Sequence, residues 1–356
     1  MTRRVWLWGM ILAAGAGCDL PRPTGYRVVV IPKGLTHEFW QSIHRGAARA
    51  GDDLTRELGT PVHVIWDGPL RERDALAQIR IVDRHISTRV DGLVLAPQHS
   101  QTMVAPVRRA VEQQLPVVII DSGLEARDLI VKYIATDNYN GGRLAALHLM
   151  KVLREEGKVA PKIILLRYAV GSESTEKREQ GFEDTINAEN QRRRTAGEPL
   201  IEWLSKDKYA GATKDSALKE AMPLLNQFRD RVDGIFCVNE SSADGMLDAL
   251  RNLGLVRKVR LMGFDSSEPL LQAVESGEVD GLILQDPYRM GYLGTWAIVQ
   301  HLRDQEIDGA LDYSTGEYVI TKENVREPAT LELHSATAQA SRTITTPKLR
   351  PRKSER

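Results

Sequence analysis

Cysteine is nearly absent from this chain of 356 residues, which contains only Cys18 and Cys237. Two cysteines cannot build the multi-bridge framework of small secreted domains, so the fold must rest on a hydrophobic core. Neither sign of charge is in excess, because Lys and Arg number 48 and Asp and Glu also number 48. A nucleic-acid-binding chain normally carries a basic excess, so this balance argues against a nucleic-acid partner.

Long apolar runs are also missing. The uncharged N-terminal stretch Val5 to Ala14 is about ten residues long, whereas a membrane-spanning helix takes roughly 20. Arg3 and Arg4 precede this stretch, and small residues follow it. A positive start, a short apolar segment and small residues are typical of a secretion signal, so we expect residues 1–17 to be a signal peptide.

The small residues lead directly into Cys18, which indicates a lipobox with lipidation of the Cys18 thiol. Gly15 stands where a lipobox usually has an aliphatic residue, so an ordinary signal peptide followed by a chance cysteine stays open. Residues 18–25 then predict a lipid-anchored tether. We expect the protein in the cell envelope, in the periplasm or on the outer face of the cytoplasmic membrane.

After the tether, β-branched apolar segments alternate with segments of helical spacing. Strands are expected over residues 27–31, 62–66, 92–96 and 116–120, and again over 162–166, 200–204, 234–238, 259–264 and 281–284. Their nearly continuous Val, Ile and Leu composition is typical of parallel strands that helices cover on both faces. We therefore predict an α/β fold of two similar, doubly wound parallel-sheet lobes.

Ligands of open parallel sheets bind beyond the carboxyl ends of the strands, so the residues that follow the strands are the candidate site. These positions carry Phe39, Trp40, Asp121, Arg178, Asn239, Asp265 and Gln285. Carboxylates and amides can accept from sugar hydroxyls while Arg donates to them, and charged partners strengthen such bonds. An aromatic face can pack on the C–H face of the ring, so the mixture indicates a sugar.

Four segments in order carry a resemblance to a known family. They are Ile134–Asn138 followed by Gly141 and Gly142, Arg178–Phe182, Cys237–Glu240 with Gly245, and Met262–Asp265. From about Tyr26 to Glu327 the chain resembles the ribose-, allose- and galactose-type periplasmic binding proteins, whose type I fold is shared with lac-repressor-type regulators.

The resemblance implies two lobes joined by a three-segment hinge. Residues 26–136 with 286–314 would form the N-terminal lobe, and 137–285 with 315–333 the C-terminal lobe. The chain would cross between lobes near Thr136–Asp137, Asp265–Ser267 and Gln285–Asp286, with Asp137 and Asn138 as hinge and helix-cap residues. Residues 334–356 lack an apolar period, so we expect a disordered tail.

The resemblance also implies ligand-binding roles. Phe39 and Trp40 would sandwich the sugar ring, and Tyr209 would supply a second aromatic wall. The polar ligand-binding positions would be Asp121, Arg178, Asn239, Asp265 and Gln285. His37 falls where the family often has Asn. Ser122 falls where ribose binders carry a second Arg, and the loss of that donor argues against ribose itself.

The expected function is capture of a monosaccharide by hinge closure and its delivery to the membrane permease of an ABC importer, by a monomer without a cofactor. A sensor that serves a signalling receptor stays open. No nucleotide-binding or serine-nucleophile motif points to an enzyme, and the histidines lack the spacing of a metal site. A transcription regulator of the same fold would need a DNA-binding helix-turn-helix before Tyr26, where the signal peptide is expected.

Overall fold

The computed structural model describes residues 24–351 of the chain. The predicted signal peptide, Cys18 and all of the tether but its last two residues lie outside this range. Among the described residues, no helix has both the length and the apolar character needed to cross a membrane.

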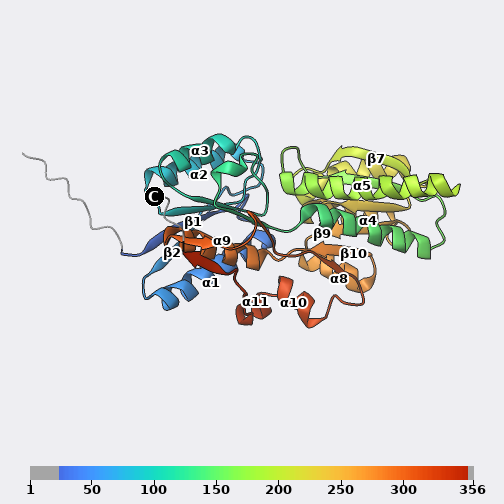
Figure 1. Ribbon diagram of the computed structural model, residues 1–356. Coiled ribbons are helices and arrows are strands. Elements are labelled where there is room, and N and C mark those ends of the chain that lie inside the picture. Colours follow the sequence, from blue (N-terminus) through green and yellow to red (C-terminus); the bar gives the residue numbers. More distant parts are fainter. Residues whose placement is uncertain (1–23, 352–356) are drawn as a thin grey trace, which may run out of the picture.

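The structure has two lobes side by side, each built on a six-stranded sheet (Figure 1). The N-terminal lobe contains β1 (Tyr26–Ile31), β2 (Val62–Trp66), β3 (Gly92–Leu95), β4 (Val117–Ile120), β5 (Lys132–Ala135) and β12 (Asp312–Ser314). Its helices are α1 (Glu38–Leu58), α2 (Ala75–Ser87), α3 (Val104–Glu112) and α9 (Pro287–Leu302), with a 3-10 turn at Arg127–Leu129.

The C-terminal lobe repeats this design. Its strands are β6 (Lys162–Arg167), β7 (Glu202–Tyr209), β8 (Gly234–Cys237), β9 (Arg260–Phe264), β10 (Gly281–Leu284) and β13 (Tyr318–Ile320). Its helices are α4 (Asn138–Glu155), α5 (Glu173–Ala196), α6 (Lys214–Phe228), α7 (Glu240–Leu253) and α8 (Glu268–Ser276). The sheets run β12-β5-β4-β3-β1-β2 and β13-β10-β9-β8-β6-β7, so each strand has a counterpart in the other lobe. Only the pairing of β13 with β10 is antiparallel in these two sheets.

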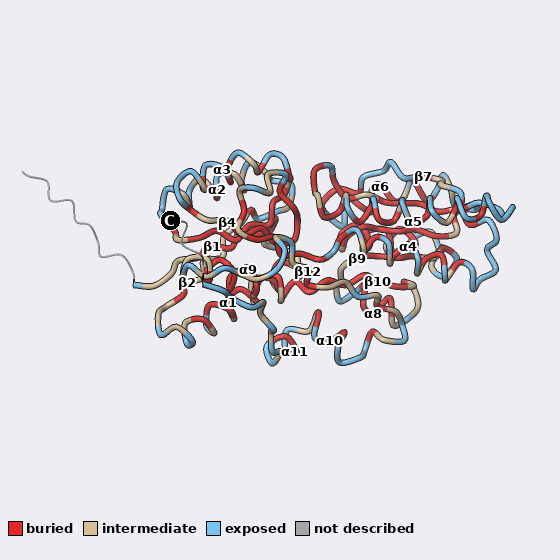
Figure 2. Tube along the Cα trace, viewed as in Figure 1, coloured by how far each residue is buried: buried red, intermediate tan, exposed pale blue. Residues whose placement is uncertain are grey.

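Each sheet is buried on both faces, which explains the continuous apolar strands. Successive side chains of a strand point to opposite faces. Val28 and Val30 of β1 accordingly pack in one hydrophobic cluster of the N-terminal lobe, whereas Val29 and Ile31 pack in the other. The C-terminal lobe likewise has two clusters, and the tube in Figure 2 shows the strands of both lobes as buried.

Between residues 26 and 320 the chain crosses between the lobes three times. It crosses at 136–137 from β5 to α4, at 285–286 from β10 to α9, and at 315–317 from β12 to β13. The crossing expected near Asp265–Ser267 was wrong. Ser267 instead caps α8, accepting a hydrogen bond from the Leu270 backbone N–H at 3.3 Å, and α8 packs into the core of the C-terminal lobe. The crossing at 315–317 was not among the hinge segments named from the sequence, although the expected lobe ranges change at residue 315; β12 and β13, which flank it, have only three residues each.

The expected disorder of the tail was also wrong for residues 334–351. The chain forms α10 (Pro328–His334) and α11 (Ala336–Ser341), and β14 (Leu349–Pro351) pairs with β11 (Gln305–Ile307) as an antiparallel ribbon. Few tail residues are apolar, so the segment carries little local pattern, and contacts with the two lobes hold it in place.

Glycines let two helices approach closely in each lobe. At Gly142 of α4 an added Cβ would lie 1.9 Å from the carbonyl oxygen of Arg178, and at Gly181 of α5 it would lie 2.0 Å from that of Tyr139. The N-terminal lobe repeats this contact between α1 and α9 at Gly46. Two glycines of the motifs that carry the family resemblance are therefore packing residues.

We expect Gly142→Ala to destabilise the protein by about 3 kcal/mol, because the methyl group meets backbone that no side-chain rotation can clear. Gly277→Ala is the matched control. Gly277 has a φ of 73° with no atom within 4 Å, so only the cost of a left-handed residue, about 1 kcal/mol, is expected. Urea unfolding of both variants measures the difference, and equal losses would contradict the close-approach explanation.

Candidate functional site

A cavity of about 40 Å³ lies between the lobes, at the carboxyl ends of the strands. It is lined by Lys33, His37, Phe39, Trp40, Glu72, Asp121, Tyr168, Ser172, Ser174, Thr175, Arg178, Asn239, Glu240, Asp265 and Gln285. Eight of the ten predicted ligand-binding residues are in this set, and Ser122 and Tyr209 are not. Residues separated by more than 200 positions in the chain thus converge on one place.

Asp121 and Asp265 are counterparts in the two lobes. They follow β4 and β9, which hold the same place in their sheets, and their φ angles are 63° and 67°. Asp accepts this left-handed conformation more readily than most residues do. Each carboxylate has a cation beside it: Lys33 Nζ lies 2.8 Å from Asp121 Oδ2, and Arg178 Nη1 lies 3.4 Å from Asp265 Oδ2. Paired carboxylates with nearby cations can accept from and donate to one polyhydroxylated ligand.

Arg178 is held rigidly from several sides. Its Nε donates to Asn138 Oδ1 at 2.8 Å and its Nη1 to the Val238 carbonyl at 2.9 Å. The guanidinium also lies 3.6 Å from the centroid of the Phe264 ring. Asn138, predicted as a hinge residue, therefore orients a cavity side chain. Its neighbour Asp137 caps α4 by accepting from the Asn140 backbone N–H at 2.9 Å.

The aromatic side chains come from both lobes. Phe39 and Trp40 are edge to face, with ring centroids 4.8 Å apart. Trp40 Nε1 donates to Glu72 Oε1 at 2.6 Å, and the Tyr168 hydroxyl of the C-terminal lobe donates to the same carboxylate. Tyr168 thus stands where a second wall was expected from Tyr209. Tyr209 ends the edge strand β7, is 38% exposed, and has the Arg167 guanidinium 5.2 Å from its ring centroid.

Hydrogen bonds across the cleft hold the lobes together. Lys33 Nζ donates to the Ser174 hydroxyl at 3.2 Å and the Ser172 hydroxyl at 3.4 Å. Ser122 Oγ accepts from the Ser174 backbone N–H at 3.1 Å, so this side chain bridges the lobes rather than lining the cavity. The Gly123 N–H adds a bond of 2.9 Å to Glu173. The cleft is therefore closed in this structure.

Carboxyl groups dominate one end of the cavity. His37 Nδ1 lies 3.7 Å from Glu240 Oε1 and 4.0 Å from Glu72 Oε1. Burial, with the negative charges of Asp265 and other acids nearby, raises the pKa of Glu240 to about 9. Burial also raises the pKa of Asp265, against the opposing effect of Arg178. At neutral pH Glu240 therefore carries a proton and can donate a hydrogen bond to a ligand oxygen.

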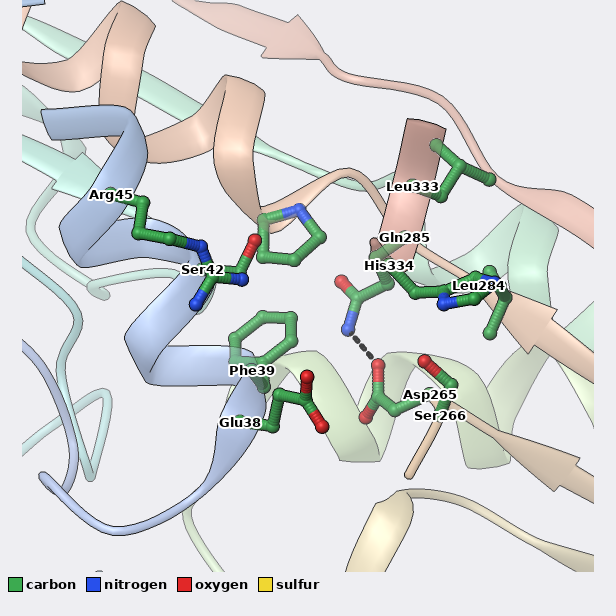
Figure 3. Close-up of a pocket in the computed structure, with 11 residues that line it drawn as sticks. Glu38, Phe39, Ser42, Arg45, Asp265, Ser266, Leu284, Gln285, Leu333 and His334 are labelled. Carbon is green, nitrogen blue, oxygen red and sulfur yellow. Dashed lines mark hydrogen bonds between the residues drawn. The ribbon is translucent and has the colours of Figure 1, made fainter. Parts of the chain in front are cut away.

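Within residues 24–351, the buried cavity atoms Glu240 Oε2 and Gln285 Oε1 have no hydrogen-bond partner, and Asp121 Oδ2 has only the Lys33 ammonium beside it. Gln285 is only 3% exposed, and its Nε2 donates to Asp265 Oδ1 at 2.5 Å (Figure 3). Unpaired buried polar atoms are unfavourable, so Gln285 Oε1 suits a ligand donor, and the protonated Glu240 carboxyl suits a hydroxyl group, which can both donate and accept.

Seven of the cavity residues were not predicted: Lys33, Glu72, Tyr168, Ser172, Ser174, Thr175 and Glu240. All follow the carboxyl end of a strand or begin the next helix. The strand-end rule would have found Lys33, two residues after β1, and Tyr168, directly after β6. No group of three or more metal-ligating side chains is present in the part of the chain that the structure describes.

Residues 28–306 match the model of the periplasmic binding protein domain. The chain belongs to this family. It is 28% identical over 262 residues to the D-ribose/D-allose-binding protein of Pseudomonas aeruginosa, covering 72% of this chain and 76% of the relative. It is 25% identical over 271 residues to the D-allose-binding periplasmic protein of Escherichia coli, covering 74% and 81%.

Solved structures agree with this family membership. A carbohydrate transporter solute-binding protein from Agrobacterium radiobacter, in complex with D-arabinose, superposes with a TM-score of 0.79 and 28% identity, covering 87% of this chain and 99% of that one. An ABC transporter solute-binding protein from Agrobacterium vitis with bound D-fucose gives 0.76 and 28%, covering 86% and 99%. The predicted two-lobed α/β fold and the family resemblance are confirmed.

Proposed function

We propose that this periplasmic binding protein captures a monosaccharide between its lobes by hinge closure and passes it to an ABC-type sugar importer, without catalysing a reaction. The observation that carries the proposal is the closed cavity itself. Paired carboxylates, two cations and an aromatic pair converge there from both lobes. Sugar binding would add contacts to both lobes at once, which stabilises the closed form over the open one.

Names of similar proteins support a sugar as the ligand. The relatives include D-ribose/D-allose-, D-allose- and xylitol-binding proteins as well as ribose import binding proteins, and similar structures hold D-arabinose and D-fucose. Phe39 and Trp40 would face the ring, and Asp121, Arg178, Asn239, Asp265 and Gln285 would bind the hydroxyls, with His37 beside them. The protein would act as a monomer in the cell envelope, anchored through a lipid on Cys18.

Lys33 gives the site a cation of its own. Ser122 stands where ribose binders carry an Arg, directly after Asp121. The cation beside Asp121 in this protein is Lys33, whose Nζ lies 2.8 Å from Asp121 Oδ2. An ammonium is a point charge, whereas a guanidinium donates two parallel bonds. The pocket would therefore select a sugar other than ribose.

Thermal unfolding of the protein with a panel of sugars tests the proposal. A sugar at 100 times its dissociation constant stabilises the folded state by about 2.7 kcal/mol, which raises the unfolding midpoint of lobes of this size by about 5 to 10 °C. The panel should include D-allose, D-arabinose, D-fucose, xylitol and D-ribose. A shift with one of the first four, larger than with D-ribose, is expected. No shift with any pentose, hexose or polyol would refute sugar binding.

A further inference from the structure

The C-terminal segment of the chain connects the two lobes a fourth time. Residues 328–351 comprise α10, α11 and β14, and are here called the C-terminal strap. The strap follows the part of the chain that matches the family model, which ends at residue 306. Figure 1 shows α10 beneath the C-terminal lobe and α11 next to it, toward the N-terminal lobe.

One end of the strap is fixed to the C-terminal lobe. Leu333 of α10 is 5% exposed and belongs to that lobe's hydrophobic core cluster. Thr330, at 4% exposed, donates from its hydroxyl to the Asn324 carbonyl at 2.9 Å. Moving α10 away would expose the Leu333 side chain to water, which is unfavourable.

The other end is fixed to the N-terminal lobe. Gln339 of α11 is fully buried, and its Oε1 accepts from the Ser42 hydroxyl at 3.2 Å and from Arg45 Nη2 at 3.0 Å. Arg49, which lies in α1 with Ser42 and Arg45, donates to the Ala340 carbonyl of α11 at 2.8 Å. Further along, Ile344 packs against the core of that lobe and β14 pairs with β11.

The strap also contacts the hinge. Arg342 Nη1 lies 2.7 Å from Asp286 Oδ2, and Asp286 is fully buried at the crossing from β10 to α9. Its other oxygen caps α9 by accepting from the Arg289 backbone N–H at 3.0 Å. Undocking the strap would leave the Asp286 carboxylate buried without its cation, and such a loss is strongly destabilising.

The two ends of the strap are joined by Ser335 alone, since α10 ends at His334 and α11 begins at Ala336. His334 and Ala336 are two residues apart and can be separated by at most about 7 Å, so the link cannot absorb a large separation of the lobes. In Figure 3, Leu333 and His334 of the strap lie close to Gln285, beside a cavity of about 30 Å³ that Phe39 and Asp265 also line. The short link is therefore next to the ligand site.

We propose that the C-terminal strap limits the opening of the cleft and holds the ligand-free protein near its closed arrangement. Closing of the cleft around a ligand then requires little movement of the lobes, because the strap keeps the closed, binding-competent arrangement populated in the ligand-free protein. The apparent affinity of a ligand rises with the populated fraction of the competent state, so the strap would tighten ligand binding without touching the ligand.

Lengthening the link tests the strap directly. Eight Gly and Ser residues inserted after Ser335 keep both docking contacts and remove the length limit. Spin labels at Leu70→Cys and Val170→Cys, which replace exposed residues of opposite lobes, report the separation of the lobes without ligand. Cys18→Ser is included in every variant, and burial raises the pKa of the Cys237 thiol, which keeps it unreactive.

The unmodified strap should give a narrow distance distribution, and the insertion should broaden it toward longer distances and weaken binding of any sugar found by the panel about tenfold. The same insertion after Gly157, in an open turn of the C-terminal lobe, should change neither. Gln339→Ala, which removes the bonds from Ser42 and Arg45 to the Gln339 side chain, should act in the same direction as the insertion. Equal distributions in all variants, or a wide one with the unmodified strap, would overturn the proposal, and neither result depends on the ligand being a sugar.

Discussion

Asp265→Asn is expected to weaken sugar binding about 100-fold, with little change in the stability of the ligand-free protein. The substitution keeps the shape of the side chain and removes its charge, and charge-assisted hydrogen bonds contribute roughly 1.5–3 kcal/mol. Asp265 lines the cavity and is paired with Arg178 and Gln285, so its loss affects both the ligand and the side chains that would position it. Isothermal titration with the sugar that gives the largest thermal shift measures the effect.

The fold should tolerate this change because Arg178 keeps two other partners. Its bonds to Asn138 and to the Val238 carbonyl do not involve Asp265. Asp215→Asn makes the same chemical change at an exposed position of α6 and should leave affinity unaltered. If Asp265→Asn binds as tightly as the unmodified protein, the assignment of this cavity as the sugar site is wrong.

Protein stability is expected to fall between pH 6 and pH 8.5 because of Glu240. The pKa of this carboxyl is about 9 in the folded protein and near 4.5 when the chain unfolds. Between these values the folded state holds a proton that the unfolded state has lost, so stability decreases as pH rises; below 4.5 and above 9 the group contributes no slope. The slope is at most about 1.4 kcal/mol per pH unit, so the loss over this interval is about 3 kcal/mol.

Glu240→Gln should remove most of this pH dependence, since the amide mimics the protonated acid at both pH values. Urea unfolding at pH 6 and pH 8.5 of the two proteins gives the difference. Glu57→Gln, at an exposed position of α1, is the control and should keep the slope of the unmodified protein. Identical slopes for Glu240→Gln and the unmodified protein would show that Glu240 is ionised in the folded state.

The strand-end rule found most of the cavity because it depends on topology alone. Once the strands are parallel, their carboxyl ends lie at one edge, and Asp121, Asn239, Asp265 and Gln285 must come near each other. The rule does not find residues that lie farther along the loops after the strands. Glu72 lies six residues beyond β2, and only the folded loop brings it to Trp40 and Tyr168.

The sequence could not show which tyrosine lines the cavity. Tyr168 and Tyr209 both follow or end a strand, and nothing local distinguishes them. In the folded protein Tyr168 follows the inner strand β6 and lines the cavity, whereas Tyr209 ends the edge strand β7 and does not. Strand order is a set of non-local pairings, which a single-sequence pattern does not contain.

The sequence by itself determined the α/β class, the two similar lobes and the kind of chemistry in the cleft, because apolar runs and strand-end polar residues are local features. Only the tertiary structure decided the ordered strap and the contacts of Lys33 with Asp121 and Ser174. Each of these depends on segments far apart in the chain meeting in space. The stabilising free energy of each comes from contacts with other parts of the chain, which the local sequence does not show.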